Sequence, residues 1–110
     1  KMDVIETIEI GTFEGFNIKL SALVEPSYIV DSFDSSVCDI QDLINKVNRY
    51  ELIWFCARVT AYKNGIKLDS EYLGGCLYES LQDFIKDLYF EDMKVQVIKN
   101  SKVIIEELTK

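Results

Sequence analysis

The stretch ELIWFCARVTAYKNGIKLDSEYLGGCLY, from Glu51 to Tyr78, decides the fold that this sequence predicts. The odd positions from Ile53 to Ala61 are all apolar, whereas the even positions from Trp54 to Tyr62 are amphipathic or polar. This period of two is typical of a strand with one dry face and one mixed face. Asn64-Gly65 follows, the dipeptide that best tolerates the positive φ angles of a type I′ turn. The stretch therefore predicts a β-hairpin.

A two-residue turn at Asn64-Gly65 also predicts the register of this hairpin. The expected partners are Tyr62 with Lys67, Thr60 with Asp69, Arg58 with Glu71, Ala61 with Leu68, and Ala57 with Tyr72. Opposite charges then meet on one face and apolar side chains on the other, which stabilises a sheet. Further along, Gly74-Gly75 interrupts an apolar run, which indicates a bulge, a bend or the close approach of another backbone. No phosphate-binding loop motif surrounds this glycine pair.

Residues 2–24 predict another hairpin, because apolar residues again alternate along both halves of the segment. A three-residue loop Phe13-Glu14-Gly15, with Gly15 in the left-handed conformation, keeps one face apolar. The resulting pairs are Ile10 with Ile18, Ile8 with Leu20, and Val4 with Val24. A two-residue loop at Glu14-Gly15 is the alternative, and it would place Ile10 against Lys19.

A helix is predicted to begin at Ser36, after a polar connection over residues 28–36. Ser36 and Asp39 have the spacing of a capping box. The expected apolar face of this helix comprises Val37, Ile40, Leu43, Ile44, Val47 and Tyr50, which recur at spacings of three and four.

Ser80 and Asp83 repeat the capping pattern before a last helical segment. Its expected apolar stripe comprises Leu81, Phe84, Ile85 and Leu88. Residues 93–110 are predicted to be helical, with a terminal hairpin as the alternative because many of their residues are β-branched. The predicted order is β-β-α-β-β-α in a single domain, residues 1–110. This is an α+β fold in which helices pack on an antiparallel sheet of two hairpins.

Composition narrows the class of protein. With 110 residues, of which 48% are hydrophobic, the chain can bury a core and is not disordered. It contains no apolar run of about 18 residues and no apolar leader, so we expect a cytoplasmic protein that does not enter the membrane. The 3 cysteines lack C-x-x-C spacing, which argues against a disulfide framework and a zinc site. Cys56 and Cys76 are expected to act as small core side chains.

The chain has no histidine, so it lacks the commonest general base and any Ser-His-Asp or Cys-His arrangement. We therefore assign no catalytic, cofactor-binding or metal-binding residues. Its net charge is −7, from 19 acidic and 12 basic residues. Such a field repels nucleic acid and anionic lipid and attracts a basic protein surface. The expected partner is a protein with a basic surface, without direct nucleic-acid or membrane binding.

Two groups of residues are candidates for an interaction surface. Asp83, Asp87 and Glu91 are four residues apart, with Asp92 and Glu79 close by, and would form an acidic ridge on a continuous helix. The ridge could mimic a row of phosphates, although a solvated helix face is the simpler interpretation. Trp54, Arg58 and Tyr62 share one strand face. These residue types dominate binding hot spots, but we expect a helix to cover this face, because a fully exposed tryptophan is uncommon.

Several segments match one group of proteins. Trp54-Phe55, Gly65, Leu68, Tyr72 to Cys76 and Tyr89 to Met93 resemble small acidic proteins encoded by bacteriophages, plasmids and other mobile elements. The resemblance covers about residues 51–93, and the tail departs from the Ala- and Glu-rich helix of that group. It implies an accessory protein acting inside a bacterial cell, and it carries over no catalytic residue.

These observations lead to three hypotheses. The first is a non-enzymatic interaction protein that inhibits a host nucleic-acid-binding or defence protein. The alternative is a small-molecule-binding or enzymatic domain that uses the Gly74-Gly75 bend with Tyr72, Cys76 and Tyr78. A deep pocket lined by Tyr72, Cys76 and Trp54 would favour this alternative. The third is a homo-oligomeric structural module.

Overall fold

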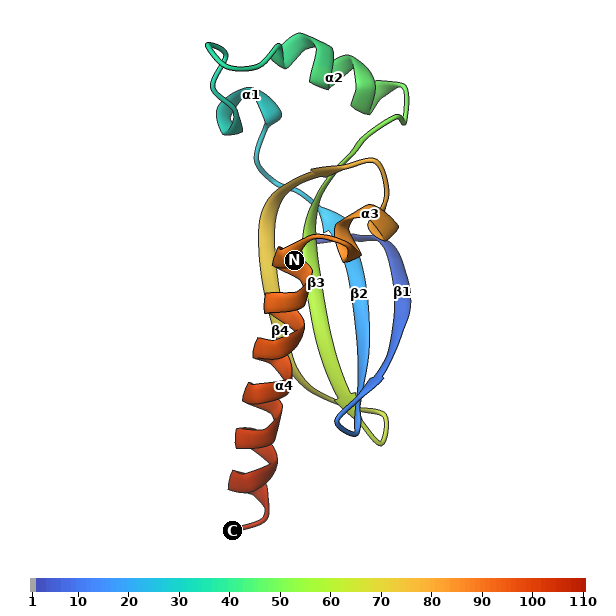
Figure 1. The fold of residues 1–110 in the computed structure, drawn as a ribbon, viewed down its shortest axis with the longest axis vertical. Helices are drawn as coiled ribbons and strands as arrows, with labels where there is room; N and C mark the ends of the chain where they lie inside the picture. The colour runs from blue at the N-terminus through green and yellow to red at the C-terminus, as the bar shows by residue number, and fades with distance from the viewer. Residues whose placement is uncertain (1) are drawn as a thin grey trace.

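The fold is α+β, as predicted. The computed structural model describes residues 2–110, which form a four-stranded antiparallel sheet and four helices (Figure 1). Each strand pairs with its neighbour in sequence, in the order β1-β2-β3-β4. The strands are β1 (Val4–Phe13), β2 (Phe16–Val24), β3 (Ile53–Lys63) and β4 (Ile66–Tyr78). The helices are α1 (Ile29–Ser32), α2 (Ile40–Asn48), α3 (Leu81–Ile85) and α4 (Leu88–Leu108). One helix was predicted between β2 and β3, and the structure has α1 and α2 there. One helix was predicted after β4, and the structure has α3 and α4.

One face of the sheet carries the hydrophobic core. The odd-numbered residues of β3 from Phe55 to Ala61 are fully buried there, against the apolar residues of β2 and of α3 and α4. Residues 93–110 form most of α4, so the predicted helix is confirmed over the terminal hairpin. Val97 and Ile98 are buried against the sheet. Burial of one face therefore outweighs the β propensity of its branched residues.

Phe84 of α3 packs α3 and the beginning of α4 against the sheet. Its side chain has 0% exposure, and its ring centre lies 5.8 Å from that of Phe55, 5.1 Å from Tyr78 and 6.3 Å from Phe90. All three contacts are edge-on, the geometry that aromatic rings favour. This cluster joins β3, β4, α3 and α4.

The central hairpin turns where predicted but pairs differently beyond the turn. Asn64 and Gly65 both have positive φ angles, 53° and 78°, and Tyr62 pairs with Lys67 as expected. The other four predicted pairs, Thr60–Asp69, Arg58–Glu71, Ala61–Leu68 and Ala57–Tyr72, are wrong. The observed pairs are Ala61–Asp69, Thr60–Ser70, Arg58–Tyr72 and Ala57–Leu73. A bulge at Leu68 shifts the register by one residue, and Leu68 packs against the core.

The first hairpin has the two-residue loop that was the alternative. Glu14 and Gly15 both have positive φ angles, 53° and 85°, as a type I′ turn requires. Ile8 pairs with Leu20 as predicted, but Ile18 lies opposite Gly11 and Val4 opposite Leu23. The predicted pairs Ile10–Ile18 and Val4–Val24 are therefore wrong. Irregularities between Glu9 and Gly11, and between Val4 and Glu6, change the register and still keep Ile8 on the apolar face.

The first long helix starts later than predicted. Asp39 caps α2 by accepting a hydrogen bond of 3.1 Å from the Asp42 amide. Ser36 instead binds the Asp34 carboxylate, through its amide at 2.9 Å and its hydroxyl at 2.7 Å. The predicted cap at Ser36 is wrong, and Val37 lies outside the helix with 79% of its surface exposed. The preceding connection, predicted to be irregular, contains the short helix α1.

The predicted cap at Ser80 is confirmed, since its hydroxyl accepts a hydrogen bond of 3.2 Å from the Asp83 amide. The stripe that was expected to continue through Leu88 ends earlier. Helix α3 stops at Ile85, and α4 starts after Asp87, which caps it. Because the chain changes direction at this junction, Leu88 is 79% exposed.

Helices α1 and α2 form a lobe beyond one end of the sheet, at the top of Figure 1. The two helices pack on each other, and two chain segments connect them to β2 and β3. The molecule is consequently elongated, with extents of 53 × 26 × 22 Å. A cleft lies between this lobe and the sheet.

Candidate functional site

The glycine pair in β4 is a bulge, as its sequence indicated. Gly74 and Gly75 both stand opposite Cys56, and Gly75 has a φ angle of +66°. The Gly75 amide donates a hydrogen bond of 2.7 Å to the Glu25 carboxylate. A Cβ atom at Gly74 would lie 3.0 Å from the same carboxylate oxygen. The bulge thus exposes a backbone amide and leaves room for a side chain from the lobe connection to reach it.

A second contact from the sheet holds the lobe beside this bulge. The indole nitrogen of Trp54 donates a hydrogen bond of 2.9 Å to the Ser27 carbonyl, and the Trp54 ring lies 5.9 Å from that of Phe33. Glu25 also accepts hydrogen bonds from the Ser27 amide, at 2.9 Å, and from its hydroxyl, at 2.6 Å. We refer to the contacts of Glu25 and Trp54 with Gly75 and Ser27 as the latch.

The latch should depend on pH through Glu25. Burial raises the pKa of Glu25, but hydrogen bonds from Ser27 and Gly75 outweigh this effect and bring it below the usual 4.5. A carboxyl group whose pKa is lowered by folding stabilises the fold above its unfolded pKa, and loses that contribution as pH falls through the folded value. Glu25→Gln should therefore destabilise the protein at pH 7, and the difference from wild type should shrink below about pH 4.5.

Urea denaturation across this pH range would measure the effect. Glu106→Gln is the matched control, because the Glu106 side chain is exposed and has no hydrogen bond or ion pair within residues 2–110. This variant should show no comparable pH-dependent difference. An equal difference between Glu25→Gln and wild type at pH 3 and pH 7 would show that the ionised carboxylate does not hold the lobe.

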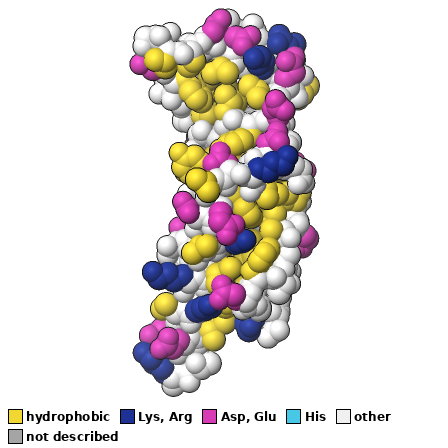
Figure 2. Space-filling model, in the orientation of Figure 1, with side chains coloured by type: hydrophobic (Ala, Val, Ile, Leu, Met, Phe, Trp, Pro, Cys, Tyr) yellow, Lys and Arg dark blue, Asp and Glu magenta, His cyan; other side chains and the backbone are white. Residues whose placement is uncertain are grey.

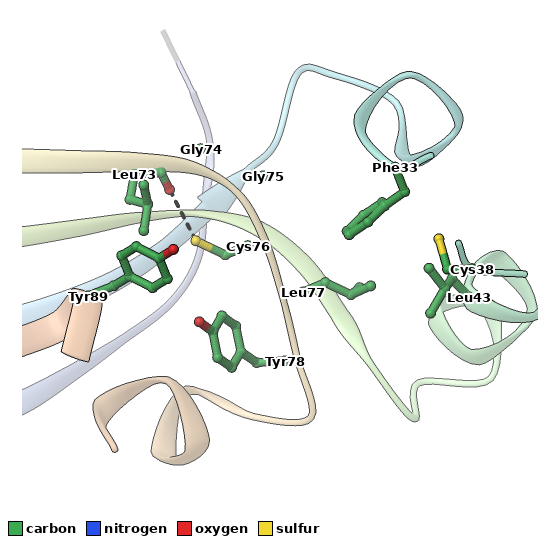
Figure 3. Close-up of a pocket in the computed structure, with 10 residues that line it drawn as sticks. All are labelled: Phe33, Cys38, Leu43, Leu73, Gly74, Gly75, Cys76, Leu77, Tyr78 and Tyr89. Atoms are coloured by element: carbon green, nitrogen blue, oxygen red, sulfur yellow. Dashed lines mark hydrogen bonds between the residues drawn. The ribbon is translucent and has the colours of Figure 1, made fainter. Parts of the chain in front are cut away.

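A cleft of about 510 Å³ opens between the lobe and the bulge (Figure 3). Phe33, Cys38 and Leu43 project into it from the lobe, and Leu77 reaches toward them from the sheet. Its lining consists of Phe33, Cys38, Leu43, Leu73, Gly74, Gly75, Cys76, Leu77, Tyr78 and Tyr89. We call this space the junction cleft. It is within the size range of small-ligand pockets, and its lining is mostly apolar.

The polar groups of the junction cleft are already paired. The Tyr78 hydroxyl donates a hydrogen bond of 2.7 Å to Asp87, which also accepts one from the Tyr89 amide at the start of α4. Burial raises the pKa of Tyr78, and Asp87 raises it further, whereas the hydrogen bond from Tyr78 lowers the pKa of Asp87. At neutral pH the pair is therefore a neutral phenol and an ionised carboxylate. This pairing fixes the position of the Tyr78 side chain against the start of α4 and keeps Asp87 negatively charged.

The two buried thiols in and near the cleft, those of Cys76 and Cys56, are protonated. Cys76 donates a hydrogen bond of 3.2 Å to the Leu73 carbonyl (Figure 3), and burial raises its pKa to about 11. Burial likewise raises the pKa of Cys56. Both residues are buried, as predicted, and a protonated thiol is a poor nucleophile. Cys38 is the only one of the 3 cysteines that is partly exposed.

The predicted acidic ridge does not lie on one continuous helix. Asp83 belongs to α3 and has Lys86 at 3.8 Å, whereas Glu91 belongs to α4 and has Lys94 at 3.0 Å. Asp87 lies between the two helices and is engaged by Tyr78. Asp92 is exposed on α4. The acidic residues therefore form separate points of charge around the α3–α4 junction.

These residues belong to a larger acidic surface, which we call the acidic end. It comprises residues 25–52 and 79–92, with eleven acidic and three basic residues, a net charge of −8. The rest of the sequence has eight acidic and nine basic residues, a net charge of +1. Figure 1 shows the lobe at one end of the long axis, and α3 and the start of α4 between the lobe and the middle of the molecule. The charge is thus strongly polarised along the molecule.

Apolar side chains are exposed on the acidic end. Figure 2 shows hydrophobic side chains gathered on the lobe, with acidic side chains around them. The most exposed of those on the lobe and its connections are Tyr28 at 73%, Val30 at 57%, Val37 at 79% and Tyr50 at 92%. None of the residues of α2 is fully buried, although its apolar residues are concentrated on one face. Amphipathic helices normally bury that face, so this end has hydrophobic surface available for a partner.

The face of β3 with Trp54, Arg58 and Tyr62 is not the helix-covered face. Helices α3 and α4 pack on the opposite, odd-numbered side, so the predicted cover is wrong. Trp54 contacts the lobe, and the Tyr62 ring lies 4.8 Å from the Lys19 ammonium. Arg58 donates a hydrogen bond of 3.4 Å to Ser21, and its buried Nε has no acceptor among residues 2–110. The structure spreads these three residues along the strand, apart from the junction cleft.

Sequence reasoning found four of the ten residues that line the junction cleft. Gly74, Gly75, Cys76 and Tyr78 line it as the second hypothesis required, but Tyr72 does not, because it pairs with Arg58 on the other side of β4. Trp54 borders neighbouring hollows instead. The lobe residues that line the cleft were missed. No local signal marks Phe33 or Leu43, since their contacts depend on how the lobe folds back on the sheet.

Comparisons with known proteins leave the chain without an assigned family. No family model, curated protein or solved structure matches it. Within residues 2–110, no group of three or more Cys, Asp or Glu side chains is arranged to hold a metal ion. The same residues contain no helix with a long enough apolar stretch to cross a membrane.

Proposed function

We propose that this protein is a non-enzymatic interaction protein whose acidic end binds a basic surface of another protein. The supporting observation is the coincidence, at one end of the molecule, of a net charge of −8 and exposed apolar side chains. Complementary charge accelerates encounter and selects the partner. Apolar side chains that become buried supply most of the affinity.

The resemblance to proteins of mobile elements suggests which partner this is. Proteins that bind nucleic acid present Lys and Arg to phosphates, and an acidic protein competes for that basic surface. We therefore propose that the partner is a nucleic-acid-binding or defence protein of a bacterial host, and that binding inhibits it. Acidic residues such as Glu79 and Asp92 would occupy positions otherwise taken by phosphates.

A pull-down with two charge-reversed variants tests this proposal. Glu79/Asp92→Lys alters the acidic end, and Glu106/Glu107→Lys alters the far end of α4. Each double variant changes the net charge from −7 to −3. The side chains of Glu79 and Asp92 make no hydrogen bond or ion pair within the described residues, so their replacement should leave the fold intact.

Wild-type protein should retain a basic nucleic-acid-binding protein from bacterial lysate at low salt and release it at about 1 M salt, where the Debye length falls to ~3 Å. The acidic-end variant should lose this partner, and the α4 variant should keep it. Equal loss in both variants would mean that only net charge matters. Retention by both variants would contradict the proposed role of the acidic end.

Small-ligand binding is a second candidate function, favoured by the junction cleft and its volume of about 510 Å³. Leu77 reaches into the middle of the cleft (Figure 3), so Leu77→Gln should weaken such a ligand. A thermal-shift screen of metabolites would test this function. If no compound raises the melting temperature of wild type more than that of Leu77→Gln, the candidate is excluded.

A further inference from the structure

We infer that the junction cleft receives an apolar side chain of the protein partner, carried on a segment whose flanking residues are basic. This inference rests on the proposed function, because it names the part of the acidic end that contributes specificity. The acidic end would then recognise its partner through a pocket as well as through charge.

The first argument is the shape and lining of the cleft. Phe33 and Leu43 approach from the lobe and Leu77 from the sheet, so an inserted side chain would contact apolar atoms on both sides (Figure 3). The volume of about 510 Å³ leaves room for a large aliphatic or aromatic residue. Binding hot spots commonly consist of such an anchor in a desolvated pocket.

The second argument is the set of acidic residues that contact or adjoin the lining of this apolar space. Glu25 binds the lining residue Gly75, and Asp87 binds the lining residue Tyr78. Asp39 follows Cys38 in the chain, and the Asp34 carbonyl accepts a hydrogen bond from the Cys38 thiol. An apolar cleft whose lining residues have acidic neighbours matches an apolar anchor between Lys or Arg residues.

The carboxylates of Glu25, Asp34 and Asp87 remain charged at neutral pH. Hydrogen bonds from the Ser36 amide and hydroxyl lower the pKa of Asp34, and the hydrogen bond from Tyr78 lowers that of Asp87. The pKa of Glu25 is lowered as well, since its hydrogen bonds outweigh the effect of burial. The charge around the cleft therefore persists over the whole physiological pH range.

The third argument is the incomplete packing beneath α2. Leu43 lines the junction cleft, Ile44 borders a hollow of about 350 Å³ beside Trp54, and Val47 borders another of about 400 Å³. The apolar face of α2 thus lies over three spaces that side chains of this chain do not fill. A partner segment that places apolar atoms there would complete the packing and gain the associated transfer free energy.

Two probe peptides separate the cleft from simple charge attraction. The first is a synthetic peptide of Leu and Lys, about four helical turns long with leucines at helical spacing. The second has the same number of lysines, with serine in place of leucine. A third peptide of Leu and Glu tests the requirement for basic flanks. Trp54, the only tryptophan, borders this region and reports binding through its fluorescence.

Alkylation of Cys38 locates the bound peptide. Cys38 lines the cleft and is partly exposed, whereas Cys56 and Cys76 are buried, so a thiol reagent should modify Cys38 first. The Leu/Lys peptide should bind about tenfold more tightly than the Lys/Ser peptide. At a concentration of about ten times its Kd, it should slow alkylation of Cys38 about tenfold. The Leu/Glu peptide should not bind.

Matched variants assign the effect to one side chain. Leu43→Gln should weaken the Leu/Lys peptide about tenfold, whereas Leu108→Gln, at the opposite end of the molecule, should not change it. Protection of Cys38 in wild type provides a test that does not depend on either variant folding. Strong binding of the Leu/Glu peptide would overturn the requirement for basic flanks.

The outcomes distinguish this inference from the proposed function. Suppose that both lysine peptides bind wild type equally, bind the Glu79/Asp92→Lys variant more weakly, and leave Cys38 unprotected. The inference is then wrong, and the charge-based function stands. If the Leu/Lys peptide protects Cys38 equally in wild type and in that variant, the cleft binds an apolar anchor and the charge-based function fails. If no peptide binds, the inference is overturned together with its basis.

Discussion

Replacement of Phe84 by alanine is expected to lower the free energy of unfolding by about 3–5 kcal/mol. The Phe84 ring is completely buried and touches Phe55, Tyr78 and Phe90 edge-on. Truncation removes these contacts and leaves a cavity at the place where β3, β4, α3 and α4 meet. Since a domain has a total stability of about 5–15 kcal/mol, the variant should be partly unfolded at moderate temperature.

Urea denaturation followed by circular dichroism would measure this loss. Leu88→Ala is a suitable control because Leu88 is only four residues away, is 79% exposed and should change stability by less than about 0.5 kcal/mol. A loss below about 1 kcal/mol for Phe84→Ala would show that the aromatic cluster does not hold the helices on the sheet. The junction cleft would then lack the rigid wall that Tyr78 provides.

Replacement of Gly75 by valine is the second change with a large expected effect, a loss of about 1–3 kcal/mol. Gly75 has a φ angle of +66°, a left-handed conformation that β-branched residues strongly disfavour. Its added Cβ would also lie 3.5 Å from the Trp54 ring. The strain falls on the latch, so Glu25 and Trp54 should lose their hold on the lobe.

Gly65→Val separates backbone strain from this loss of contact. Gly65 also has a positive φ angle, +78°, but a Cβ there would meet no atom within 4 Å. Both variants should be less stable than wild type, and only Gly75→Val should change the Trp54 fluorescence and accelerate alkylation of Cys38. Unchanged stability and fluorescence in Gly75→Val would contradict the role assigned to the bulge.

The sequence by itself determined the turn of the central hairpin, the buried face of β3 and the cap of α3. The alternation from Ile53 to Ala61 correctly identified the buried face of β3, because side chains point to opposite faces with a period of two. Asn64-Gly65 forms the predicted turn, because a two-residue hairpin loop needs positive φ angles at both positions. The helix cap at Ser80 follows from its own hydroxyl and a neighbouring amide.

Features that depend on competition between partners were harder to predict. Ser and Asp side chains can both cap a helix. Asp39 caps α2, whereas Ser36 is bound to the Asp34 carboxylate. The bulge at Leu68 shifted the β4 register by one residue without disturbing the turn. The residue that the bulge adds, Leu68, packs against the core, and no local pattern marks this contact with distant segments.

Only the tertiary structure decided the candidate site. Glu25 and Gly75 are 50 residues apart, and their hydrogen bond requires the lobe connection to pass over the bulge. Phe33 and Leu43 reach the cleft from a lobe whose position no periodicity encodes. Turns, strand faces and caps depend on residues a few positions apart, so a sequence pattern reveals them. The acidic end and its cleft instead arise from distant segments, which come together only when the whole chain has folded.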